Sequence, residues 1–286
     1  MKKLLFQLDT DPYPSTFDTV VAYDGGADHV TGYGNVTPQN VGALVDGTIF
    51  TRAPKDKKYT AIFIGGSNMA AGQELFRAVK KKFFANFRVS VMLDSNGSNT
   101  TAAAGVAMLT RSGSIAGKRA VVLAGTGPVG LRAAALLAKE GASVALTSRK
   151  RERAENACSQ IKERFGASVS PIEAVDNAAR GAALKGTHVV FAAGAAGAQL
   201  LEESHWQNNP SIELMADANA TPPLGIAGVD MMDKAANRHG KTVYGAIGFG
   251  GLKLQVHRAC IGKLFDSDNQ VFDAEEIYAI AKSMAQ

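Results

Sequence analysis

Three glycines in the middle of the chain have the spacing of a phosphate-binding turn. Gly125, Gly127 and Gly130 follow an apolar run at residues 119–123 and precede an alanine-rich run at residues 131–139. This order predicts a buried strand, a tight turn and a helix start, where backbone N–H groups and the helix dipole converge on one point. That point suits a pyrophosphate, although a glycine turn in an unrelated strand–helix unit is the alternative. The predicted cofactor-binding residues of this turn are Gly125, Thr126, Gly127, Pro128, Val129 and Gly130.

The end of the next predicted strand, residues 142–147, indicates which dinucleotide binds. NAD sites usually place Asp or Glu about 20 residues beyond the first glycine, where it bonds the ribose 2′-hydroxyl. This chain has Ser148, Arg149 and Lys150 instead, with no acid before Glu152. A hydroxyl, a guanidinium and an ammonium attract a 2′-phosphate, which a carboxylate would repel. We therefore predict NADP as the cofactor, with a solvated basic helix start as the alternative.

Small residues follow three later predicted strands, at residues 187–193, 211–217 and 243–247. They would let a nicotinamide ring approach the backbone, although tight turns of an α/β fold also use such residues. The further cofactor-binding candidates at these strand ends are Ala193, Gly194, Asn219 and Gly248.

Lys253 is a candidate for a functional cation. We predict a helix that begins after Gly251, which places Lys253 in its first turn, near the positive end of the helix dipole. A cation in that unfavourable position suggests an anionic or carbonyl partner. A lysine that extends into solvent is the alternative.

The elements that position these residues form an alternating pattern. Before the glycine motif, strands are predicted at residues 3–8, 60–64 and 88–93, each followed by a polar loop and a helix. The helices expected here follow a cap at Ser15 or Thr16 and cover residues 37–50, 69–84 and 100–109. Alternating strands and helices predict a mostly parallel sheet, with the loops after its strands at one edge.

The same alternation continues to the C-terminus and predicts a two-domain α/β protein. Residues 1–110 are expected to form one mostly parallel α/β domain, and residues 111–250 a Rossmann-like NADP-binding domain. Residues 110–117 are rich in Gly and Ser and mark the crossing between them. Residues 251–286 are expected to form helices that pack back toward the first domain.

Composition narrows the class of protein. The chain has 286 residues, 46% of them hydrophobic, and a formal net charge of +5. No apolar run approaches the ~20 residues of a membrane span, and the N-terminus turns polar too early for a signal peptide. The two cysteines form no metal-ligand spacing with the five histidines. We expect a cytoplasmic protein with no metal, no membrane and no nucleic-acid partner.

Five segments taken together resemble one family. They are YDGGADH at residues 23–29, GYGNVTP at 32–38, MLDSNGSNTTAAAG at 92–105, AGTGPVG at 124–130 and GGLKL at 250–254. The chain is similar to the bacterial NADP-dependent methylene-tetrahydromethanopterin dehydrogenases of methylotrophs, some of which also accept methylene-tetrahydrofolate. The resemblance covers nearly the whole chain. Only the glycine motif is generic, and residues 94–105 are much more specific.

The resemblance implies a fold and a reaction. It implies two α/β domains with a cleft between them, a reduced pterin over the first domain, NADP on the second, and a homo-oligomer that is expected to be a trimer. It also implies hydride transfer from the one-carbon bridge of the methylene-pterin to NADP, which gives the methenyl form. Related enzymes that also hydrolyse the methenyl product use a Lys and Tyr pair, which we could not place here, so we expect dehydrogenase activity alone.

The pterin implied by the resemblance presents amide and amino groups, which Asp, Asn and Thr side chains bind well. We predict catalytic roles for Asp94, Asn96 and Lys253, the last as the residue that orients the pterin or its carbonyl. For Asp94, a strand-end cap serving the turn at Asn96 is the alternative. The substrate-binding candidates are Asn99 and Thr100, with Asp9, Asp11 and Asp18 as weaker ones.

Two other functions fit parts of the sequence. A non-catalytic NADP-binding sensor or scaffold would need only the glycine motif, and the elaborate loop that starts at Asp94 argues against it. An NADP dehydrogenase of a small hydroxy acid would need a Lys and Asp acid–base pair, and no such pair stands out. A sister family accepts NAD, and Ser148, Arg149 and Lys150 argue against membership in it.

Overall fold

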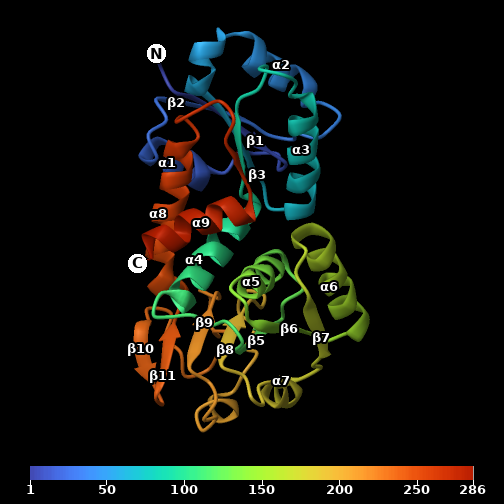
Figure 1. The fold of residues 1–286 in the computed structure, drawn as a ribbon, viewed down its shortest axis with the longest axis vertical. Coiled ribbons are helices and arrows are strands. Elements are labelled where there is room, and N and C mark those ends of the chain that lie inside the picture. Colours follow the sequence, from blue (N-terminus) through green and yellow to red (C-terminus); the bar gives the residue numbers. More distant parts are fainter. Residues whose placement is uncertain (286) are drawn as a thin grey trace. The chain divides into compact units, whose positions relative to one another are not determined.

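A computed structural model describes residues 1–285 and divides them into two compact units (Figure 1). The first unit contains Met1–Thr100 and Leu254–Ile280, and the second contains Thr101–Lys253 and the described residues from Ala281 on. The division falls within three helices, α4 (Ser98–Thr110), α8 (Ala246–Lys263) and α9 (Ala274–Met284), rather than in the loop after residue 110.

The first unit is built on a five-stranded sheet in the order β12-β4-β3-β1-β2, and every neighbouring pair is parallel. Its strands are β1 (Leu4–Asp9), β2 (His29–Tyr33), β3 (Thr60–Gly65), β4 (Ser90–Leu93) and β12 (Val271–Phe272). Its other helices are α1 (Thr16–Asp24), α2 (Gly42–Phe50), α3 (Met69–Lys82) and α9 (Ala274–Met284), the last of which ends in the second unit. Because the strands run in one direction, the loops after β1, β3 and β4 lie at the same edge.

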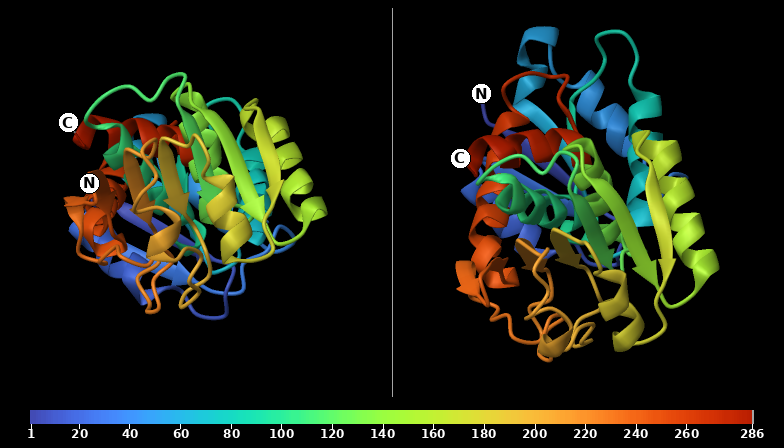
Figure 2. Two further views of the ribbon diagram at one scale, coloured as in Figure 1. Left: turned by 90° about the horizontal axis from the view of Figure 1, so that it is seen from below. Right: turned by 60° about the horizontal axis from the view of Figure 1, so that its bottom comes forward.

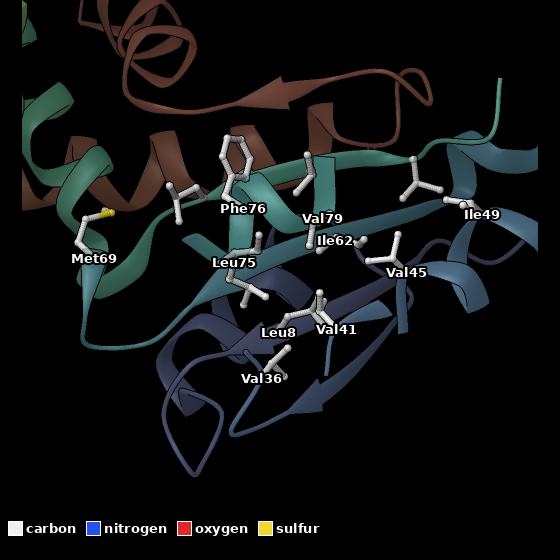
Figure 3. Close-up of a cluster of buried hydrophobic side chains, with 14 residues drawn as sticks. Leu8, Val36, Val41, Val45, Ile49, Ile62, Met69, Leu75, Phe76 and Val79 are labelled. Carbon is white, nitrogen blue, oxygen red and sulfur yellow. The ribbon is translucent and has the colours of Figure 1, made fainter. Parts of the chain in front are cut away.

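The core of the first unit lies between this sheet and helices α2 and α3 (Figure 3). β3 is buried along its whole length, which explains why its sequence is almost continuously apolar and does not alternate between apolar and polar residues. α3 instead buries one stripe, at Leu75, Phe76 and Val79, and exposes Lys80 and Lys81. This core fixes the strand ends that carry the polar loops.

The second unit is built on a seven-stranded sheet in the order β10-β11-β9-β8-β5-β6-β7. Its strands are β5 (Arg119–Leu123), β6 (Ser143–Ser148), β7 (Val169–Glu173), β8 (Val189–Ala192), β9 (Leu214–Asp217), β10 (Lys234–Arg238) and β11 (Lys241–Tyr244). Only β10 is antiparallel to its neighbour. Helices α5 (Pro128–Lys139), α6 (Arg151–Phe165) and α7 (Asn177–Ala183) connect the parallel strands, and α5 and α6 lie side by side (Figures 1 and 2).

This strand order matches that of dinucleotide-binding domains. The chain runs outward from β5 to β6 and β7, then returns to the other side of β5 at β8. Ligands of open parallel sheets bind beyond the carboxyl ends of the strands at such a reversal. The reversal lies between β5 and β8, so the glycine motif after β5 is at the expected place.

The predicted α/β class with two parallel sheets is confirmed, but several elements differ from the prediction. The helix expected from Thr37 begins at Gly42, after a turn. The strand expected at residues 243–247 ends at Tyr244, and α8 begins at Ala246 rather than after Gly251. The short strands β2, β10 and β12 were not predicted. In the part of the chain described, no helix is long and apolar enough to cross a membrane.

Candidate functional site

The glycine turn is tied to the neighbouring strand β6 by one threonine. The N–H of Ala124 donates to Oγ1 of the buried Thr147 at 3.0 Å, and the N–H of Gly125 donates to the Thr147 carbonyl at 3.0 Å. Ala124 has a φ of 50°, a left-handed conformation that is unusual for a residue with a side chain. Strain of this kind is often found where backbone must face a ligand.

The three glycines meet different steric demands. A Cβ on Gly125 would lie 2.8 Å from Cβ of Leu146, and one on Gly130 would lie 2.6 Å from Cα of Gly125. Both positions therefore need glycine for packing. A Cβ on Gly127 would meet nothing within 4 Å, and Gly127 is the N-cap of α5, with Pro128 at its first position. The open space at Gly127 is where a phosphate would meet backbone N–H groups.

Basic side chains stand at the end of β6, as a 2′-phosphate requires. Oγ of Ser148 accepts the N–H of Lys150 at 3.3 Å, and both Arg149 and Lys150 are exposed. Of the acids in the first two turns of α6, Glu155 accepts the guanidinium of Arg151 at 2.7 Å, and Glu152 lies in the first turn. The turn thus presents positive charge.

The remaining cofactor candidates lie at the same edge of the second sheet but differ in what they offer. The N–H of Ala193 donates to the Leu123 carbonyl at 3.0 Å, which places the end of β8 beside the glycine turn, and Gly194 packs on Leu200. The side chain of Asn219 holds its own loop, since it accepts the Thr221 N–H at 2.9 Å and donates to the Pro223 carbonyl at 3.1 Å.

Packing explains why residue 248 is glycine. A Cβ there would overlap the carbonyl oxygen of Asp233, and one on Gly245 would overlap that of Asp230. The prediction that Lys253 lies in the first helical turn is wrong, because α8 already begins at Ala246 and Lys253 is its eighth residue. The helix dipole therefore gives no reason for this lysine, which is half-buried.

Asp94 forms the start of α4 in the first unit. Its buried carboxylate accepts the N–H groups of Asn99 at 2.8 Å and Thr100 at 3.1 Å, and the Thr100 hydroxyl at 2.6 Å. Asn99 is buried as well, and its amide donates to the Leu93 carbonyl and to Oδ1 of Asp273. The Asp94 carboxylate is thus a cap, as the alternative interpretation expected, but it serves the first turn of α4 rather than the turn at Asn96. The three buried side chains form the framework of the loop.

Asn96 is the exposed member of that loop. It has a φ of 54°, and its N–H donates to the Gly66 carbonyl at 2.7 Å. Oγ of the buried Ser95 donates to the Gly65 carbonyl at 2.9 Å, so the loops after β3 and β4 are joined. The rigid backbone leaves the Asn96 amide at the surface of the sheet edge, where a ligand has access to it.

The acids after β1 also organise loops. Buried Asp9 accepts the N–H groups of Asp11 and Ser15, and Asp11 accepts both the N–H and the hydroxyl of Ser67. Asp18 in α1 is half-buried, and its carboxylate lies 3.5 Å from where a Cβ on Gly65 would stand. Asp18 therefore shares the sheet edge with Asn96.

Comparison with known proteins places the chain in a family. A family model described as methylene-tetrahydromethanopterin dehydrogenase, N-terminal, matches residues 16–96. Over 99% of both chains, the sequence is 63% identical to the "Bifunctional protein MdtA" of Methylorubrum extorquens. It is 32% identical, again over 99% of both chains, to an NAD(P)-dependent methylenetetrahydromethanopterin dehydrogenase of the same organism. The chain belongs to the methylene-tetrahydromethanopterin dehydrogenase family.

Solved structures share the fold of this dehydrogenase. Quinate dehydrogenase from Corynebacterium glutamicum, in complex with NAD, aligns with a TM-score of 0.57 at 13% identity over 99% of each chain. A likeness at this identity indicates architecture and not substrate.

Sequence reasoning missed an aromatic group in the first unit of this dehydrogenase. The buried His257 ring stacks on Phe63 with centroids 5.4 Å apart, and Phe17, which is 48% exposed, lies 6.4 Å from His257. Phe63 also approaches the Gly65 position that Asp18 faces. One signal in the sequence could have pointed to His257. It follows the candidate Lys253 by four residues, about one helical turn, so the two side chains lie on the same face of α8.

Across residues 1–285 of the dehydrogenase, no group of three or more His, Cys, Asp or Glu side chains is arranged to hold a metal ion.

Proposed function

We propose that this chain oxidises methylene-tetrahydromethanopterin, and also methylene-tetrahydrofolate, by transferring a hydride to NADP. The products are the methenyl form of the pterin and NADPH. The observation that carries this proposal is the full-length relationship to the two Methylorubrum proteins, one of them named for this activity. The open glycine turn and the basic residues after β6 agree with the cofactor.

The reaction asks the protein mainly for binding and alignment. The carbon that loses the hydride is bonded to two nitrogens, whose lone pairs stabilise the cation that forms. NADP, when bound, accepts the hydride at its nicotinamide ring. The residues of the chain must then hold two rings in a near-attack geometry and exclude water.

We assign the cofactor to the edge of the second sheet. In this proposal the N–H groups around Gly127 bind the pyrophosphate, and Ser148, Arg149 and Lys150 bind the 2′-phosphate. Ala193 and Gly194 give the nicotinamide side close access to backbone, while Asn219 and Gly248 act by shaping the backbone near it.

We assign the pterin to the edge of the first sheet. Asn96 and Asp18 are its proposed polar contacts, and the exposed ring of Phe17 is a proposed stacking surface. Asp94, Asn99, Thr100 and Asp9 are proposed to position the loops rather than to contact the pterin, because their side chains are buried. Lys253 is proposed to orient the pterin by binding the carbonyl group of the pterin.

The test is a direct assay. The purified protein is mixed with methylene-tetrahydromethanopterin or methylene-tetrahydrofolate and NADP, and NADPH is followed by its absorbance. We expect NADPH formation that requires a pterin, with a lower rate when NAD replaces NADP. Absence of signal with both pterins would contradict the proposal and would favour a binding-only role or another substrate such as a small hydroxy acid.

We also propose that the protein is a cytoplasmic homo-oligomer, with a trimer as the expected state. Light scattering coupled to size-exclusion chromatography measures the mass directly. A mass of about 30 kDa, that of one chain of 29.9 kDa, would contradict an oligomer.

A further inference from the structure

Arg180 is a buried cation whose hydrogen-bond acceptors are all neutral. It lies in α7 and is 9% exposed. Its Nε donates to the Leu200 carbonyl at 2.8 Å, its Nη1 to the Ala174 carbonyl at 3.4 Å, and its Nη2 to Oδ1 of Asn177. Two carbonyls and an amide satisfy the geometry of the guanidinium but leave its charge without a direct counterion.

The bonds of Arg180 reach the two loops that border the proposed NADP site. Ala174 follows β7 directly, and its N–H donates to the Ser148 carbonyl at 2.8 Å. Since Arg180 donates to the carbonyl of the same Ala174, this residue links Arg180 to the predicted 2′-phosphate turn. Leu200 lies in the connection after β8, which begins at Ala193 and Gly194. The guanidinium is therefore bonded to two of the connections that border the sheet edge at which the cofactor is expected.

Burial, rather than any neighbouring charge, has the largest effect on the pKa of Arg180. Burial lowers the pKa of the guanidinium, the carboxylate of Asp176 raises it, and the like charge of Arg149 lowers it again. The Asp176 side chain is exposed and accepts the Ala179 N–H at 2.7 Å as the cap of α7. A buried charge without a paired counterion is costly, unless an anion binds nearby.

We propose that Arg180 is a specificity-determining residue that supplies buried positive charge for the 2′-phosphate of NADP, behind the exposed Arg149. The inference rests on the proposed NADP site. It assigns to Arg180 an electrostatic role at a distance, and to Arg149 the direct contact. Since NAD lacks the 2′-phosphate, the charge favours NADP over NAD.

The test compares dissociation constants for NADP and NAD, measured by calorimetry or fluorescence quenching, in Arg180→Gln and Arg180→Lys. Arg180→Gln removes the charge, and we expect the NADP-over-NAD preference to fall about tenfold, the size of one partly screened charge near a phosphate. Arg180→Lys keeps the charge but not the three bonds, and we expect it to lose less than about threefold. Equal losses in the two variants would show a purely structural role and overturn the proposal.

Two further variants separate the possible outcomes. Arg119→Gln is the matched control, because Arg119 also donates to a carbonyl, that of Ala183, but lies at the opposite end of the sheet strands. An equal loss of preference in this control would overturn the proposal.

Asn177→Asp keeps Arg180 and adds a carboxylate at its Nη2 acceptor, so it tests the charge even if Arg180→Gln does not fold. We expect a reduced preference, and an unchanged one would overturn the proposal. A wild-type protein without any preference for NADP would instead contradict the NADP site itself.

Discussion

Gly127 separates the needs of the fold from those of the cofactor. Its backbone, with φ of −83° and ψ of 171°, suits any residue, and a Cβ there meets no protein atom within 4 Å. We expect Gly127→Ala to keep the melting temperature but to weaken NADP binding by about tenfold or more, because the methyl group enters the phosphate position. Gly130→Ala is the contrasting variant, which should lower the melting temperature because its Cβ lies 2.6 Å from Gly125. Unchanged NADP affinity in Gly127→Ala would contradict this site.

Arg149 is expected to distinguish the two dinucleotides by direct contact. Arg149→Ala removes an exposed guanidinium next to Ser148, so NADP affinity should fall about tenfold or more while NAD affinity changes little. The measurement is a pair of binding titrations with NADP and NAD. An equal loss for both would mean that the side chain does not serve the 2′-phosphate.

Lys253 is expected to serve the pterin rather than NADP. We expect Lys253→Ala to bind NADP as the wild type does and to turn over about tenfold to a hundredfold more slowly, because a group that orients the substrate contributes less than the roughly hundredfold to thousandfold of a donor that stabilises developing charge. Lys263→Ala is the matched control, since Lys263 is an exposed lysine in the last turn of the same helix. If Lys253→Ala turned over as fast as the Lys263→Ala control, the prediction would be wrong and Lys253 would have no part in the reaction.

At the scale of elements, the connection after β9 is held by a buried carboxylate. Asp217 accepts the N–H groups of Asn219 and Ile226, yet burial raises its pKa above the ordinary value despite these bonds. Folding therefore shifts the ionisation of Asp217 toward its neutral form, relative to the unfolded chain. As pH rises above about 4 and through the raised pKa, ionisation of Asp217 costs folding free energy.

Asp217→Asn tests this linkage. The variant loses stability at every pH because an amide cannot replace both acceptor oxygens, but we expect the deficit to shrink as pH rises from about 4 to 7. Denaturant unfolding of both proteins across this range measures the difference. A deficit that grows with pH would contradict the raised pKa.

The elements that the sequence predicted well are those whose local pattern agrees with their tertiary surroundings. β3 and β5 are apolar runs, and α5 follows glycines whose spacing has few structural uses. α8 was misplaced because glycines at 245, 248, 250 and 251 oppose helix formation locally, whereas close packing on the carbonyls of Asp230 and Asp233 requires two of them. β12 has two residues and exists through its pairing with β4, which no local pattern reveals.

The same reasoning explains which site residues could be found. Glycines and basic residues of the second unit act through backbone geometry and surface charge, and both leave a pattern in the sequence. The polar residues after β4 were found as a group, but their division into buried framework and exposed Asn96 depends on hydrogen bonds across loops. The pairing of His257 with Phe63 joins elements far apart in sequence, and the position of Arg180 depends on a hydrogen bond to a loop carbonyl, that of Leu200, which no local pattern reveals.

At the scale of the whole molecule, the two units are expected to unfold together. α4 and α8 are continuous helices whose residues are divided between the units, so unfolding of either unit removes part of a helix from the other. We therefore expect one calorimetric transition. NADP at about 1,000 times its dissociation constant should add ~4 kcal/mol and raise that single transition by several degrees. Two transitions, of which NADP shifts only one, would show instead that each unit is a separate cooperative domain.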